Sequence, residues 1–142
     1  MANRFYRTGS PPPFILQLKP GHPRIRTVVD KVKLSEVFDN LFANAIKYRR
    51  SDESLSVTVT CEALGDRYRV RVSDKGIGIE SGSEVRIFEE GYRGPNAIKR
   101  AQGSGLGLWL ARRYMREMGG DVTLEQPAGP TTFVVDIVKK KP

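Results

Sequence analysis

The sequence has 142 residues, enough for one compact domain, and 39% of them are hydrophobic, an ordinary share for a protein with a single buried core. No apolar run approaches the roughly 18 residues that cross a membrane, the N-terminus lacks the apolar segment of a secretory signal, and the one cysteine, Cys61, excludes an internal disulfide. These features predict a cytoplasmic domain that makes no membrane contact itself. A formal charge of +8 favours anionic ligands or acidic partner surfaces, but the basic residues accompany no nucleic-acid motif, so nucleic acid is not expected as a partner.

The N-terminal third alternates between irregular, strand-like and helix-like sequence. Residues 1–13 end in Ser-Pro-Pro-Pro and have no periodicity, which predicts a linker or arm before a domain of residues 14–142. Short strands are predicted at residues 14–16 and 25–29. Across residues 30–48, apolar side chains recur at three- and four-residue steps, which predicts a long amphipathic helix.

The rest of the chain predicts two hairpins and a second helix. Alternating strand-like runs cover residues 55–64, 67–73, 121–125 and 131–138, and an amphipathic helical run covers residues 106–118. Residues 74–105 are rich in glycine and charge, and a connection of that length is usually functional. This order predicts an α/β (α+β) fold, a two-layer sandwich in which a mixed sheet carries helices on one face.

The long helix carries a polar stripe formed by Asn40, Asn44, Lys47 and Tyr48. Asparagine is a poor helix former, so two of them one turn apart suggest a fixed polar role. Asn44 can offer an amide oxygen to Mg²⁺, and Lys47 can reach a phosphate. The alternative is a pair of incidental surface amides.

Two glycine-rich motifs flank the long connection. Asp74 begins Asp-Lys-Gly-Ile-Gly-Ile, where Gly76 and Gly78 allow a flat ligand close to the backbone and the carboxylate can accept a hydrogen bond from an adenine amino group. Residues 103–108 read Gly-Ser-Gly-Leu-Gly-Leu and lead into the second helix, where backbone amides can bind phosphate oxygens. Each motif alone could instead be a simple acidic turn or a glycine hinge.

Between these motifs, residues 86–94 combine an aromatic side chain with basic ones. Phe88 is interpreted as fixing one end of a lid, and Arg93, Lys99 or Arg100 as approaching the phosphates. Solvated loop charge is the alternative for each of these basic residues.

Together and in this order, the motifs resemble the catalytic ATP-binding domain of sensor histidine kinases, in the superfamily shared with type II topoisomerases, mismatch-repair ATPases and a heat-shock chaperone. Residues 40–48 resemble its N box, 74–79 its first glycine box, Phe88 and its neighbours its F box, and 103–108 its second glycine box. The resemblance covers residues 14–138 and implies a Bergerat-type ATP-binding fold. Gly129-Pro130 departs from the family's usual Gly-x-Gly before Thr131.

The resemblance implies ATP and Mg²⁺ as cofactors, with Asn40, Asn44 and Lys47 in the catalytic centre and Asn44 as the metal ligand. It implies that the nucleotide is contacted by Asn44, Lys47, Tyr48, Asp74, Gly76, Gly78, Ile79, Phe88, Arg93, Gly103, Ser104, Gly105, Leu106, Gly107 and Thr131. Hydrolysing members carry a glutamate at the position of Asn40, and an amide is no general base, so phosphoryl transfer is favoured over hydrolysis.

The acceptor is expected outside this sequence. The only histidine, His22, lies between prolines in a turn and cannot be the helical phosphoacceptor. The expected partners are therefore a histidine-bearing dimerisation domain and a response regulator receiver domain. The dimerisation domain is expected either in a longer parent protein, with or without a membrane anchor, or in trans. The alternatives are an ATP-binding sensor or docking module without catalysis, and a serine kinase similar to bacterial anti-sigma factors.

Overall fold

The computed structural model describes residues 14–18, 21, 23–50, 55–94 and 105–141. Its elements are β1 (Phe14–Leu18), α1 (Lys31–Lys47), β2 (Leu55–Leu64), β3 (Arg67–Asp74), α3 (Gly107–Glu117), β4 (Asp121–Gln126) and β5 (Thr131–Val138). These bounds confirm the predicted long helix, the second helix and both hairpins to within one or two residues. Neither α1 nor α3 is long and apolar enough to cross a membrane.

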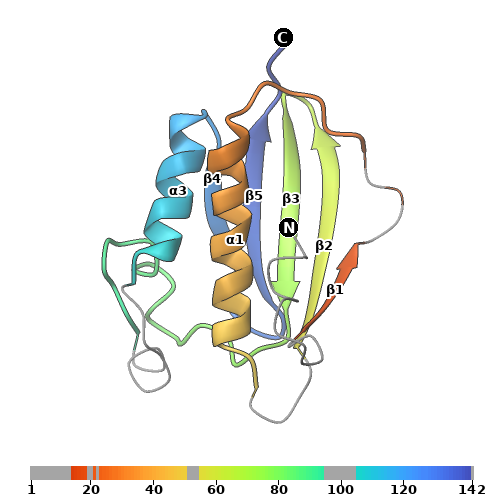
Figure 1. The fold of residues 1–142 in the computed structure, drawn as a ribbon. Coiled ribbons are helices and arrows are strands. Elements are labelled where there is room, and N and C mark those ends of the chain that lie inside the picture. The colour runs from red at the N-terminus through yellow and green to blue at the C-terminus, as the bar shows by residue number, and fades with distance from the viewer. Residues whose placement is uncertain (1–13, 19–20, 22, 51–54, 95–104, 142) are drawn as a thin grey trace.

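The strands form one mixed sheet in the order β1-β2-β3-β5-β4. β1 pairs with β2 in parallel, and the other three pairs are antiparallel. Figure 1 shows α1 and α3 side by side on the same face of this sheet. The arrangement confirms the predicted two-layer sandwich.

The core lies between the helices and the sheet because both present alternating or periodic apolar residues to the same layer. On β3, every second residue is buried, from Tyr68 to Asp74. The helix α1 contributes Val37, Phe38, Leu41, Phe42 and Ala45. Asp30 caps the start of α1, where its carboxylate accepts from Val32 N at 3.0 Å and Lys33 N at 3.1 Å.

The opposite face of the sheet is polar, and its arginines are paired. Arg69 makes a bidentate contact with Asp136, at 2.8 and 3.1 Å. Arg71 binds Glu62 at 2.6 Å and Glu125 at 3.0 Å. Part of the chain's positive charge is thus used in ion pairs on the solvent side of the sheet, away from the helices.

The strand predicted at residues 25–29 is wrong, because the structure gives residues 23–30 no strand. Ile25 and Val28 are 40% and 51% exposed, so these two apolar side chains are not buried against a sheet. The segment is instead fixed by contacts to the edge of the fold, where Arg26 N donates to the Tyr68 hydroxyl and Thr27 Oγ1 donates to Val138 O.

We expect Leu41→Ala to lower the free energy of unfolding by about 2–5 kcal/mol, because the substitution leaves a cavity among close-packed side chains. Leu41 is 2% exposed, whereas Leu64, at the β2–β3 hairpin, is 37% exposed and provides the control Leu64→Ala. Urea denaturation of both variants measures the difference, and equal losses would contradict this assignment of the core.

Candidate functional site

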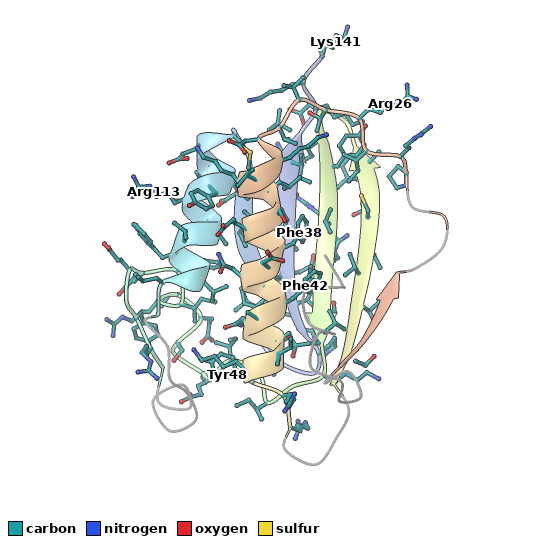
Figure 2. The ribbon with its side chains drawn as sticks, viewed as in Figure 1. Arg26, Phe38, Phe42, Tyr48, Arg113 and Lys141 are labelled. Carbon is teal, nitrogen blue, oxygen red and sulfur yellow. The ribbon has the colours of Figure 1, made fainter. Side chains whose placement is uncertain are left out.

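A cavity of about 300 Å³ opens between the C-terminal half of α1, the connection after β3 and the start of α3. Its described lining consists of Asn40, Ala43, Asn44, Lys47, Tyr48, Gly78, Ile79, Glu80, Ser83, Ile87, Tyr92, Arg93, Gly94, Gly105, Gly107 and Leu108. In Figure 2, Tyr48 marks this end of the molecule, and Arg26 and Lys141 mark the opposite end. The three sequence motifs that flank the cavity are far apart in the chain, so only folding brings them together.

The first glycine motif is joined to the end of α1 by main-chain contacts. Ile77 N donates to Tyr48 O at 2.9 Å. A Cβ on Gly76 would lie 2.5 Å from Tyr48 O, and a Cβ on Gly78, whose φ is +84°, would lie 2.8 Å from the Ala128 Cβ. Both positions therefore require glycine, at Gly76 for close approach and at Gly78 also for backbone conformation.

Asp74 is the last residue of β3, and its side chain is buried with 6% exposure. Gly76 N donates to its Oδ1 at 2.9 Å. Burial raises the pKa of Asp74, and the hydrogen bond from Gly76 opposes that effect. The carboxylate is thus held in one orientation in a place that disfavours its charge.

Thr131 lies directly opposite Asp74 in the β3–β5 register. Its hydroxyl donates to Pro127 O at 3.2 Å, and the same carbonyl accepts from Ile79 N at 2.8 Å. Asp74, Gly76 and Thr131 do not themselves line the cavity. Gly76 precedes Ile77, whose N–H donates to the O of the lining residue Tyr48, and Thr131 shares the Pro127 carbonyl with the N–H of the lining residue Ile79.

Two cationic side chains, Lys47 and Arg93, line the same cavity. Burial lowers the pKa of Lys47, and the charge of Arg93 lowers it further. Burial raises the pKa of Tyr48, and Arg93 acts in the opposite direction. Like charges that face one partly buried space repel each other, so this end of the cavity favours an anion.

The two asparagines of α1 line the cavity, and Asn40 faces the start of α3. Asn40 Nδ2 is buried and has no hydrogen-bond partner among the described residues. The nearest atom to a Cβ built on Gly107 would be Asn40 Oδ1, at 3.7 Å. Asn44 lines the cavity one turn further along α1. A buried amide donor without a partner fits a ligand that supplies an acceptor.

The second glycine motif is described from Gly105 onward, and Gly103 and Ser104 lie outside the described residues, as do His22, Lys99 and Arg100. Gly105 has a φ of +71°, and a Cβ there would lie 2.8 Å from the backbone of Gly91. Gly105 and Gly107 line the cavity, but Leu106 does not, and its side chain is 38% exposed.

Phe88 also lies outside the cavity lining. Its ring meets that of Phe133 edge-on, with centroids 6.2 Å apart and an interplanar angle of 89°, and the Arg112 guanidinium lies 4.5 Å from the centre of the Phe88 ring. The aromatic side chain thus fixes the connection after β3 to the sheet and to α3.

The sequence did not reveal several lining residues, among them Glu80, Ser83, Ile87 and Tyr92. They fall in residues 80–94, which lack periodicity but form successive turns. Ser83 and Ile87 are both buried, at 6% and 8% exposure. Their four-residue spacing, which is typical of one face of a helical turn, was the sequence signal that could have indicated them.

Comparison with known proteins gives a consistent result. A family model described as histidine kinase-, DNA gyrase B- and HSP90-like ATPase matches residues 29–141. The sensor protein kinase WalK of Staphylococcus saprophyticus is 35% identical over 111 residues, which make up 78% of this chain and 18% of that protein. WalK of Staphylococcus haemolyticus is 33% identical, with the same shares covered. The chain therefore spans less than a fifth of the length of these relatives.

Solved structures show the same fold. The catalytic domain of histidine kinase ThkA superposes with a TM-score of 0.74 at 24% identity, over 91% of this chain and 82% of that one. Full-length ShkA in complex with AMPPNP superposes with a TM-score of 0.75 at 25% identity, over 99% of this chain and 28% of that one. The family match covers the described core from the last residues before α1 to the end of β5, and the chain belongs to the histidine kinase-, DNA gyrase B- and HSP90-like ATPases.

Proposed function

We propose that this chain is the ATP-binding catalytic domain of a sensor histidine kinase, and that it transfers the γ-phosphoryl group of ATP to a histidine on a separate dimerisation domain. Its curated relatives are sensor protein kinases, and the ShkA structure contains AMPPNP. The observation that carries the proposal is a cavity that two cations, Lys47 and Arg93, line, with the buried carboxylate of Asp74 outside the lining, at the end of β3.

The adenine end is formed around Asp74. An ionised carboxylate only accepts hydrogen bonds, so it pairs with the exocyclic amino group of adenine and repels the carbonyl oxygen that guanine carries there. Gly76 N occupies Oδ1, which fixes the orientation of the carboxylate. Thr131 and Tyr48, on either side of the loop, complete the adenine end of the proposed site.

The phosphate end is formed by Lys47, Arg93 and the first residues of α3. The two side-chain cations attract the triphosphate, and the N-terminus of α3 adds backbone N–H groups and a positive dipole end. The buried Nδ2 of Asn40 supplies a neutral donor at the same end. Binding and neutralisation of the phosphates are the main work of such a site, since phosphoryl transfer depends on positioning and charge stabilisation.

Mg²⁺ fits this site as an ion bound together with the phosphates. No group of three or more His, Cys, Asp or Glu side chains is arranged to hold a metal within the part of the chain that the structure describes. Mg²⁺ commonly takes one or two protein oxygens and fills its remaining positions with phosphate oxygens and water. Asn44 lines the cavity and would supply the protein oxygen, and the ion would neutralise charge on the phosphates.

Transfer to a side chain is favoured over hydrolysis because Asn40 stands where hydrolysing members of the superfamily carry a glutamate. An amide does not accept a proton from water near neutral pH. Glu80 is the carboxylate among the described lining residues, so the release of inorganic phosphate must be measured beside transfer. A histidine-bearing dimerisation domain, a response regulator receiver domain and a cytoplasmic location complete the proposal.

We expect the chain to bind ATP in preference to GTP, and Asp74→Asn to weaken ATP binding by about 10- to 100-fold, the loss typical of a hydrogen bond to a charged group. Isothermal titration calorimetry with ATP and GTP measures both effects. Unchanged ATP affinity in the variant, or equal affinity of the wild-type chain for both nucleotides, would remove the basis of the adenine assignment.

The same substitution should stabilise the protein at neutral pH. The raised pKa means that the folded chain keeps the Asp74 proton to higher pH than the unfolded chain, so the contribution of this group to the free energy of unfolding falls as pH rises through the two pKa values. Asp74→Asn removes that loss while it keeps an acceptor for Gly76 N. Thermal unfolding should therefore show the variant's advantage at pH 7 but not below about pH 4.

The Asn44→Ala variant tests the magnesium assignment. In the wild-type chain we expect Mg²⁺ to raise the affinity for ATP. In this variant the affinity for ATP in the presence of Mg²⁺ should be about tenfold lower, because the ion loses its protein oxygen. In EDTA, wild-type chain and variant should bind ATP equally. A variant that keeps its full response to Mg²⁺ would place the ion elsewhere.

Labelled ATP and a purified histidine-bearing dimerisation domain of a sensor kinase test the reaction itself. We expect the label to move to that domain in a form that acid removes and alkali preserves, as for phosphohistidine. Nucleotide binding without a labelled partner would instead support a sensor or docking module. Acid-stable label would support a serine kinase, and release of inorganic phosphate without a labelled protein would support hydrolysis.

A further inference from the structure

Two hydroxyl groups that the nucleotide proposal does not use face each other at the cavity. Ser83 Oγ and the Tyr92 hydroxyl lie 3.0 Å apart, within hydrogen-bond distance. Both residues line the cavity, and Ser83 is 6% exposed. A phenylalanine at position 92 would pack the same ring, so packing alone does not require the Tyr92 hydroxyl.

Ser83 is held rigidly by the core. Its N–H donates to Glu80 O at 3.0 Å, and its carbonyl accepts from Ile87 N at 3.1 Å. Ile87 is 8% exposed and belongs to the hydrophobic core, and the next residue, Phe88, packs on Phe133. The Ser83 hydroxyl is therefore a fixed point in the cavity wall.

Tyr92 lies at the far end of the same segment. Its N–H donates to Glu89 O at 3.2 Å, and the Arg86 guanidinium lies 4.5 Å from the centre of its ring. A Cβ built on Gly94 would lie 3.3 Å from Ser83 Oγ. Ser83 thus borders the chain on both sides of Arg93.

Arg93 lines the cavity together with a second cation, Lys47. Its charge lowers the pKa of Lys47, which shows that the two cations act on each other across the cavity. A contact that fixes the preceding residue reduces the conformational freedom that binding must remove.

We infer that the Ser83–Tyr92 hydroxyl pair holds Arg93 in place for a polyphosphate, so that Tyr92 is a positioning residue that sets how strongly the site distinguishes ATP from the bare nucleoside. This inference rests on the proposed nucleotide-binding function. It assigns Tyr92 and Ser83 no contact with the reacting atoms.

Calorimetry on the whole chain with ATP and with adenosine tests this role in the Tyr92→Phe variant. We expect ATP binding to weaken by about 3- to 10-fold, the range for loss of one neutral hydrogen bond, while adenosine binding and the melting temperature stay as in the wild-type chain. Ser83→Ala should give the same loss, the two substitutions together should add nothing, and Ser83→Thr, which keeps the hydroxyl, should restore wild-type binding.

The Tyr92→Phe substitution is also made in a chain that carries Arg93→Ala. If the hydroxyl pair acts through Arg93, Tyr92→Phe should leave ATP affinity unchanged in a chain that already lacks the guanidinium. Tyr68→Phe is the matched control, since it removes a hydroxyl that accepts from Arg26 N at 3.3 Å, at residues that do not line the cavity, and should not change ATP binding.

Three results would overturn the inference. Equal weakening of ATP and adenosine would make the pair a general support of the pocket, and a full Tyr92→Phe loss in the Arg93→Ala background would indicate direct contact with the ligand. Unchanged ATP binding in Tyr92→Phe would show that the pair has no role while the proposed function stands. A wild-type chain that binds neither ligand would refute the nucleotide proposal itself.

Discussion

The site depends on one main-chain junction, the hydrogen bond from Ile77 N to Tyr48 O at 2.9 Å. It fixes the end of α1 against the loop that follows β3, and the approach is so close that Gly76 has no space for a Cβ. The polar stripe of α1 is thereby held at the cavity, with the carboxylate of Asp74 close behind the loop that borders it. A side chain at position 76 would have to part the two elements, and both ends of the proposed nucleotide site would separate with them.

Charge is distributed differently on the two faces of the sheet. On the solvent face, Arg69 and Arg71 bind carboxylates, and such pairs contribute solubility and modest stability. At the cavity, Asp74 is buried where its charge is disfavoured, and Lys47 faces the charge of Arg93. Local stability alone would not select that arrangement, and the proposed ligand, with an amino group at one end and phosphates at the other, would bring a hydrogen-bond donor to the carboxylate and negative charge to the cations.

Periodicity was informative where one element packs on a continuous apolar layer. It predicted the bounds of α1 and β3 accurately. A repeat of three to four residues shows which face of a helix is buried, and a repeat of two residues shows which face of a strand is buried. The strand prediction failed at residues 25–29, where Ile25 and Val28 are exposed and contacts of Arg26 and Thr27 to the end of the sheet hold the segment. Periodicity gave nothing for residues 80–94, whose successive turns have no single period.

The sequence by itself determined the order of elements, the family resemblance and the residue types at both ends of the proposed site. The reason is that the glycines, the asparagines and Asp74 occur in short motifs whose spacing is visible in the sequence alone. Only the tertiary structure decided which of them line the cavity. Of the predicted contacts that it describes, it left Asp74, Gly76, Phe88, Leu106 and Thr131 out of the lining, and it brought Ser83 and Tyr92 into it. The physical reason is that the walls of a cavity come from segments that are far apart in the sequence. The contact between Ser83 and Tyr92 depends on how successive turns pack against the core, and no local sequence repeat encodes that packing.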